Sequence, residues 1–168
     1  MDEAPFKRID AEGLKAGIDS TLKMLNHVLA NRARLVVEHG ETGEIEVAPA
    51  LLNQVIMNLV QNAAEAVTPP DGIIRVSTRR TGDELVIEVA DNGPGIPAEL
   101  RDRVFEPFFT TKVVGEGTGL GLSMSYQIVD RHGGRIEIAT APEGGAVLRV
   151  LLPAIGRAGD IMARGTVS

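Results

Sequence analysis

The spacing of apolar residues divides the chain into segments of helical and of extended character. Leu14, Ile18, Leu22, Leu25 and Leu29 recur at intervals of three or four, which is typical of an amphipathic helix. By the same criterion the sequence predicts helices over residues 11–33, 49–67 and 119–132. Segments of alternating or continuous aliphatic character predict strands over residues 34–38, 44–47, 73–78, 85–90, 135–140 and 146–152.

These segments do not alternate as strand–helix–strand units throughout, so we expect an α+β fold. The predicted architecture is a two-layer α/β sandwich, in which a mixed, mostly antiparallel sheet has helices on one face. Residues 97–104 suit one or two helical turns, and residues 105–118 are irregular. Residues 1–153 therefore form one predicted domain, and residues 154–168, which are small, polar and aperiodic, form a predicted flexible tail.

Composition narrows the classes of function. The 168 residues carry a net charge of −6 and no basic stripe interleaved with aromatic residues, so nucleic acid is not an expected partner. The absence of cysteine excludes disulfides and thiolate-bound zinc. No apolar run approaches the roughly 20 residues of a membrane span, and the N-terminus lacks the pattern of a signal peptide. We expect a cytoplasmic chain without direct membrane contact, whose parent protein can still be membrane-anchored.

Two asparagines lie on one face of the helix predicted over residues 49–67. Asn58 and Asn62 are four residues apart, which places them one turn apart on that face. Amide oxygens suit Mg²⁺, an ion that relies on substrate phosphates for part of its coordination. The pair indicates a metal–phosphate site, although such a pair also occurs on helices whose polar residues merely face water.

A carboxylate beside a glycine-rich turn follows the strand predicted over residues 85–90. Asp91 ends that strand, and Gly93 and Gly95 flank Pro94, so a ligand can approach the backbone closely. The carboxylate can accept a hydrogen bond from an exocyclic amino group such as that of adenine, whereas guanine would present a carbonyl oxygen in the same pose. An unpaired buried charge would cost about 1–3 kcal/mol or more, which is enough to select the base. The alternative is a simple turn after a strand.

A second glycine-rich segment precedes the helix predicted over residues 119–132. Gly117, Gly119 and Gly121 would expose backbone N–H groups at a helix N-terminus, where the macrodipole favours phosphate. The segment lacks the Gly-Lys-Ser/Thr ending of a P-loop and the context of a dinucleotide fold. Taken alone, it is also compatible with a flexible connector.

The irregular segment between these motifs is rich in phenylalanine. Three of the four phenylalanines of the chain lie within residues 105–109, which predicts a hinge that packs one end of a mobile lid. Lys112 either places its charge on a γ-phosphate or is a solvated surface lysine.

In this order, the motifs resemble those of the ATP-binding catalytic domain of sensor histidine kinases, within the wider ATPase family shared with gyrase, Hsp90 and MutL (the Bergerat fold). Residues 58–66 resemble the N box, 91–95 the G1 box, 105–108 the F box and 117–122 the G2 box, and the resemblance covers about residues 9–152. It implies ATP and Mg²⁺ as cofactors. It also implies transfer of the γ-phosphoryl group to a histidine on a separate dimerisation and phosphoacceptor domain, with a response regulator downstream.

Carried over by position, the resemblance implies that Asn62 is the metal ligand, that Asp91 binds the adenine amino group, and that Asn58 and Lys112 take part in catalysis. The residues that would contact the nucleotide are Asn58, Asn62, Asp91, Gly93, Gly95, Ile96, Phe105, Phe108, Thr111, Lys112, Gly117, Thr118, Gly119, Leu120, Gly121 and Leu122.

The chain departs from the wider family at one position and lacks one expected element. Where the ATP-hydrolysing relatives carry a water-activating glutamate, this chain has Asn58, and an amide cannot act as a general base. We therefore expect phosphoryl transfer to a protein side chain, with slow hydrolysis. None of the histidines, His27, His39 and His132, has the sequence context of a phosphoacceptor, so the acceptor domain is expected to be missing from this chain.

Two alternatives of the same fold stay open. One is a nucleotide-responsive binding module without chemistry (a pseudokinase), against which the intact Asn62, Gly119 and Gly121 weigh. The other is an anti-sigma-type serine kinase, and the long leading helix favours the histidine-kinase arrangement over it.

Overall fold

The computed structural model describes residues 6–101, 103, 121–141 and 144–154 of the chain. Its elements follow in the order β1 (Lys7–Ile9), α1 (Ala11–Met24), α2 (Asn26–Leu29), β2 (Ala33–His39), β3 (Ile45–Val47), α3 (Pro49–Ala66), β4 (Gly72–Thr81), β5 (Glu84–Asp91), the 3-10 helix η1 (Ala98–Leu100), α4 (Gly121–Arg131), β6 (Arg135–Thr140) and β7 (Ala146–Pro153). Beyond Ala154, the predicted tail lies outside the described residues.

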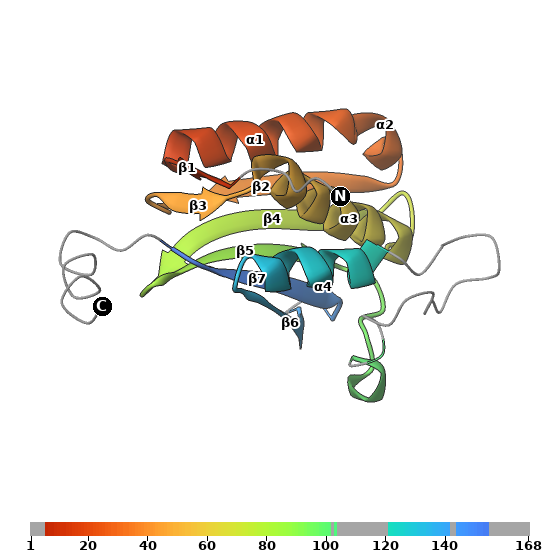
Figure 1. Cartoon of the computed structure of the whole chain (residues 1–168). Coiled ribbons are helices and arrows are strands. Elements are labelled where there is room, and N and C mark those ends of the chain that lie inside the picture. Colours follow the sequence, from red (N-terminus) through yellow and green to blue (C-terminus); the bar gives the residue numbers. More distant parts are fainter. Residues whose placement is uncertain (1–5, 102, 104–120, 142–143, 155–168) are drawn as a thin grey trace.

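The main sheet contains five strands in the order β2-β4-β5-β7-β6. β2 runs parallel to β4, and the pairs β4–β5, β5–β7 and β6–β7 are antiparallel. The helices α1, α3 and α4 lie along one side of this sheet (Figure 1). The predicted α+β sandwich with a mostly antiparallel sheet is therefore confirmed. β3 does not join this sheet but pairs with β1 in a separate two-stranded sheet.

The two faces of the main sheet differ in chemistry, as expected for strands with one buried face. On the face toward the helices, alternate β5 residues are at most 2% exposed and belong to the core, namely Leu85, Ile87 and Val89. On the other face, Glu88 lies 3.1 Å from Arg79 and 2.6 Å from Arg149. Arg149 also lies 3.4 Å from Glu137. Ion pairs thus link four neighbouring strands, β4, β5, β7 and β6, on the face that has no helices.

The first predicted helix, over residues 11–33, is wrong beyond Met24. α1 ends there, Leu25 adopts φ −93° and ψ 1°, and α2 forms a separate turn before β2 begins. Asn31 has a φ of 66°, a left-handed conformation that a right-handed helix cannot continue through. The apolar spacing runs across this break because α2 extends the same buried stripe, with Leu25 and Leu29 both buried. β1 was not predicted, since Ile9 is the only apolar residue among its three.

The second predicted helix is confirmed as α3, which packs against both α1 and α4. Pro49 occupies its first turn, where the missing N–H group costs no hydrogen bond. Its buried side consists of Leu52, Val55, Ile56, Leu59, Val60, Ala63 and Ala64. Within the described ranges, no helix is both long and apolar enough to cross a lipid bilayer.

Candidate functional site

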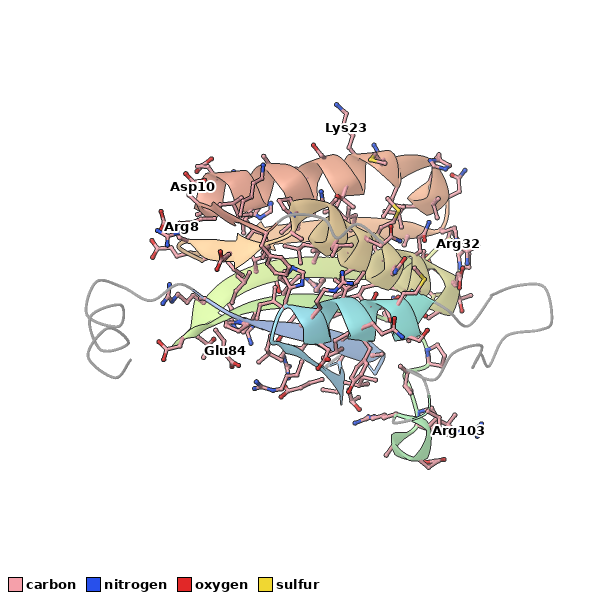
Figure 2. All side chains as sticks on the ribbon, in the orientation of Figure 1. Arg8, Asp10, Lys23, Arg32, Glu84 and Arg103 are labelled. Carbon is pink, nitrogen blue, oxygen red and sulfur yellow. The ribbon has the colours of Figure 1, made fainter. Side chains whose placement is uncertain are left out.

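Several predicted site residues meet at one end of the molecule. Figure 1 shows the end of α3, the end of β5 and the start of α4 at its right-hand side. α3 and the turn after β5 are in direct contact, because a Cβ atom added at Gly93 would lie 2.6 Å from the carbonyl oxygen of Ala66. Arg32 lies at the same end (Figure 2) and donates from Nε and Nη2 to the carbonyl oxygen of Ala64, at 3.0 and 2.9 Å. The end of α3 therefore contacts both the turn after β5 and the side chain of Arg32.

Asp91 is the last residue of β5 and is only 4% exposed. Its Oδ1 atom accepts hydrogen bonds from the backbone N–H of Gly93 at 2.8 Å and of Ala146 at 3.3 Å. Burial raises the pKa of Asp91 above its ordinary value, and the two backbone donors lower it in part. Neither bond uses Oδ2. The carboxylate is thus fixed in orientation and retains a second oxygen for a donor such as an amino group.

The turn between β6 and β7 packs directly against this carboxylate. A Cβ atom added at Gly145 would overlap the backbone carbonyl of Asp91 and would lie 2.7 Å from its Oδ1. Gly95 has a φ of +83°, and a Cβ atom there would lie 3.2 Å from the carbonyl oxygen of Gly144. No motif in the sequence marked Gly144, Gly145 or Ala146 as site residues. The only signal was a glycine pair in a hairpin turn, and such pairs are common in turns without any ligand.

Asn92 fixes the other side of the same turn. Its side-chain oxygen accepts from the backbone N–H of Ile73 at 2.9 Å, and its amide nitrogen donates to the carbonyl oxygen of Asp71 at 3.1 Å. Asp71 lies in the connection between α3 and β4, and Ile73 lies near the start of β4. Asn92 therefore holds the turn after Asp91 against the connection that follows α3, a role that its place in the motif alone did not reveal.

Asn58 and Asn62 have different surroundings, although both are half-buried on α3. The Oδ1 atom of Asn58 accepts from Gln54 Nε2 at 3.0 Å, and its Nδ2 atom donates to Ser125 Oγ at 3.2 Å. Among the residues that the structure describes, no hydrogen bond engages the side chain of Asn62. Asn58 is thus held by protein groups, and Asn62 is available to an incoming ligand.

The available amide suits a magnesium ion better than a metal that needs a full protein cage. In the described part of the chain, no group of three or more His, Cys, Asp or Glu side chains could hold a metal. Mg²⁺ commonly takes one or two protein oxygens and completes its octahedron with phosphates and water. The oxygen of Asn62 fits that role, so the residues present are compatible with a Mg²⁺–nucleotide complex.

The third predicted helix is confirmed as α4 (Gly121–Arg131), and the predicted start at residue 119 lies outside the described residues. Leu122 and Ile96 are half-buried and pack against the core. The structure does not describe the remaining predicted contacts: Phe105, Phe108, Thr111, Lys112, Gly117, Thr118, Gly119 and Leu120 lie outside its described residues. Gly121 is thus the part of the second glycine-rich segment that the structure places, as the first residue of α4.

His132, just beyond α4, joins two helices. Its Nε2 atom accepts from the backbone N–H of Ala48 at 3.1 Å, and its Nδ1 atom lies 2.8 Å from the carbonyl oxygen of Ile128. Accepting at Nε2 requires the neutral ring with its proton on Nδ1. The ring of Phe6 lies against it, with centroids 4.6 Å apart. His132 is therefore a packing residue that links the start of α3 to the end of α4.

Comparison with known proteins agrees with this geometry. Residues 47–155 match the family described as histidine kinase-, DNA gyrase B- and HSP90-like ATPases, and the chain belongs to that family. It is 49% identical over 113 residues to the nitrogen regulation protein NtrY of Azorhizobium caulinodans, a match that covers 63% of this chain and 14% of that protein. It is 42% identical over 110 residues to the sensor histidine kinase ZraS of Escherichia coli, covering 66% and 23%. The chain thus spans less than a quarter of the length of these relatives.

Similarity to solved structures identifies the class of protein within this ATPase family. The catalytic domain of the histidine kinase ThkA superposes with a TM-score of 0.77 and 30% identity, covering 89% of this chain and 96% of that one. The mycobacterial sensor histidine kinase MprB superposes with a TM-score of 0.75 and 26% identity, covering 91% and 100%. The chain is therefore an ATP-binding catalytic domain of the sensor histidine kinase type.

Proposed function

We propose that this chain binds ATP with Mg²⁺ and passes the γ-phosphoryl group to a histidine on a separate dimerisation and phosphoacceptor domain. The observation that carries the proposal is the buried Asp91 carboxylate, whose Oδ1 is fixed by two backbone donors. The amide of Asn62 and the first turn of α4 lie on elements that end or begin at the same end of the molecule. Base, metal and phosphate can thus be held by three neighbouring elements.

Each of these groups has a distinct task in the proposal. Asp91 accepts from the adenine amino group through Oδ2 and so selects adenine over guanine. The backbone N–H groups at the start of α4 face the phosphates, where the helix dipole favours negative charge. Asn62 contributes one oxygen to Mg²⁺, which neutralises charge on the phosphates when it is bound.

The nature of residue 58 favours transfer over hydrolysis. The amide of Asn58 cannot accept a proton from water near neutral pH. Hydrogen bonds also hold this amide to Gln54 and Ser125. Catalysis would then rest on positioning and charge neutralisation, and the attacking nucleophile would come from the acceptor domain.

The relatives' names support the class of partner. Since ZraS is a sensor histidine kinase, we propose a phosphoacceptor histidine domain as the direct substrate and a response regulator as the next acceptor. ATP is available in the cytoplasm, so we place the chain there, in a parent protein that can be membrane-anchored.

The direct test supplies γ-labelled ATP, Mg²⁺ and the helical phosphoacceptor domain of the parent protein. We expect label on the acceptor that is lost in acid and kept in base, as phosphohistidine requires, and no appreciable label on this chain alone. The matched control is an acceptor domain whose phosphoacceptor histidine is replaced by glutamine. Nucleotide binding without any transfer to the intact acceptor would contradict the proposal and favour a nucleotide-responsive binding module.

A further inference from the structure

Three polar side chains form a series across the contact between α3 and α4. Gln54 Nε2 donates to Asn58 Oδ1 at 3.0 Å, and Asn58 Nδ2 donates to Ser125 Oγ at 3.2 Å. Gln54 and Asn58 lie one turn apart on α3, whereas Ser125 belongs to α4, 67 residues beyond Asn58. We refer to Gln54, Asn58 and Ser125 as the polar relay.

The polar relay lies in the contact between α3 and α4, which apolar side chains alone could fill. Ser125 is 0% exposed, and the same two helices contribute Leu59 and Val129 to the hydrophobic core, at 1% exposure each. A buried hydroxyl or amide costs free energy unless it is hydrogen-bonded, and apolar groups of the same shape can be equally or more stable. Because the relay is not needed to bury these helices, its specific effect is to define how one helix sits against the other.

The two helices that the relay connects carry different parts of the nucleotide site. α4 begins at Gly121, four residues before Ser125, and this helix start is the proposed phosphate-binding end. Asn62, the proposed metal ligand, lies one turn beyond Asn58 on α3. A shift of α4 against α3 would therefore change the spacing between the metal ligand and the phosphates.

We propose that Gln54 and Ser125 are positioning residues, which orient the amide of Asn58 and set the spacing between the phosphate-binding start of α4 and the metal ligand Asn62. This inference rests on the nucleotide site described under the proposed function. Neither residue contacts the nucleotide in this scheme. Both act through Asn58, so their loss should alter how Mg²⁺ improves ATP binding more than it alters ATP binding without metal.

Because Gln54 donates to Asn58, a variant that can only accept at position 54 tests whether the orientation of the Asn58 amide matters. In Gln54→Glu the carboxylate can only accept, so the amide of Asn58 must turn over to donate to it. Its oxygen would then face Ser125, whose hydroxyl can donate as well as accept. The bonds of Asn58 to residues 54 and 125 can thus both be kept while the amide is reversed. A purely structural role would tolerate this change, whereas a positioning role would not.

The test measures the affinity of the full chain for ATP by titration calorimetry, with and without Mg²⁺, for the wild type and for Ser125→Ala and Gln54→Glu. Loss of a group that orients a metal site typically costs about 10- to 100-fold in metal affinity or activity, so we expect the Mg²⁺ enhancement to fall by about tenfold in both variants. Thr21→Val is the matched control, because it removes a 3% exposed hydroxyl whose 2.9 Å bond to the carbonyl oxygen of Gly17 stays within α1.

The outcomes separate this inference from the proposed function. Wild-type chain that does not bind ATP would contradict the nucleotide site itself. If the wild type binds ATP and both Gln54→Glu and Ser125→Ala keep its Mg²⁺ enhancement, the proposed role of the polar relay is overturned. This holds whatever the thermal stability of the variants. Should Ser125→Ala not fold, Gln54→Glu decides alone, because Gln54 is half-buried and the change adds no volume to the core.

Discussion

Asp91 Oδ1 lies 3.3 Å from the backbone nitrogen of Ala146, which is 55 residues further along the chain. The two residues meet because β5 and β7 are antiparallel neighbours in the sheet. The carboxylate that we assign to adenine is therefore positioned partly by the turn that leads into β7. A change in that turn should affect nucleotide binding without touching the nucleotide.

Gly145→Ala tests this relationship. The added Cβ would overlap the backbone carbonyl of Asp91, so we expect the carboxylate to be displaced and the affinity for ATP to fall. Gly82→Ala is the control: Gly82 has a φ of +62°, but an added Cβ there meets nothing within 4 Å. It should cost about 1–2 kcal/mol of stability through its left-handed conformation and leave ATP affinity unchanged. Equal ATP affinity in both variants would contradict the coupling of the turn to Asp91.

Asp91→Asn should separate stability from binding. Because burial raises the folded-state pKa of Asp91, its stabilising contribution is present below the unfolded-state pKa and is lost as pH rises through the folded-state pKa. The ionised carboxylate therefore opposes folding at pH 7. The amide oxygen can still accept from Gly93 and Ala146, so urea unfolding at pH 7 should show a variant at least as stable as the wild type.

The same variant should lose ATP affinity by about tenfold or more, since one good hydrogen bond to a charged group is removed. The amide nitrogen can donate to the carbonyl oxygen of guanine, so the preference for ATP over GTP should also narrow. Competition between ATP and GTP measures both effects. A folded variant with wild-type affinity and preference would show that Asp91 does not select the base.

Asn62→Ala tests the proposed metal ligand. The variant keeps the helix, because alanine has the highest helix propensity, and it removes the amide oxygen assigned to Mg²⁺. We expect ATP binding without Mg²⁺ to be unchanged and the Mg²⁺ enhancement to disappear. Asn53→Ala, at another half-buried asparagine of α3, should keep the enhancement. If Asn62→Ala still responds to Mg²⁺ like the wild type, the metal ligand lies elsewhere.

Glu88→Gln tests the ion pairs on the sheet face without helices. Burial raises the pKa of Glu88, but hydrogen bonds from Arg149 and Arg79 outweigh it, and the net pKa lies below the ordinary value of 4.5. A depressed pKa contributes stability above the unfolded-state pKa, and this is lost as pH falls through the folded-state value. The variant should therefore be less stable than the wild type at pH 7, by about 1 kcal/mol or less for a partly exposed pair.

A urea-unfolding series from neutral to acid pH measures this difference, which should shrink as the pH falls below 4.5. Glu41→Gln, at an exposed glutamate outside the network, should show no such trend. A difference that stays constant with pH would contradict the role of the charge.

The sequence predicts the start and the end of a helix correctly where residues at those two positions favour or prevent helical backbone. Pro49 at the start of α3, and the proline pair Pro69 and Pro70 after its end, made that helix predictable. α1 was extended too far because periodicity reports which residues are buried and does not report where the backbone turns, as it does at Leu25 and Asn31.

The sequence by itself determined the class of this protein, because motif residues such as Asn62, Asp91 and Gly121 carry chemistry that depends on residue type and order. Tertiary structure alone decided which groups hold Asp91 and Asn58 in place. Ala146 donates to Asp91 from 55 residues away, and Ser125 accepts from Asn58 across 67 residues. Such partners follow from strand pairing and helix contact, which bring together segments whose separation along the chain leaves no local pattern.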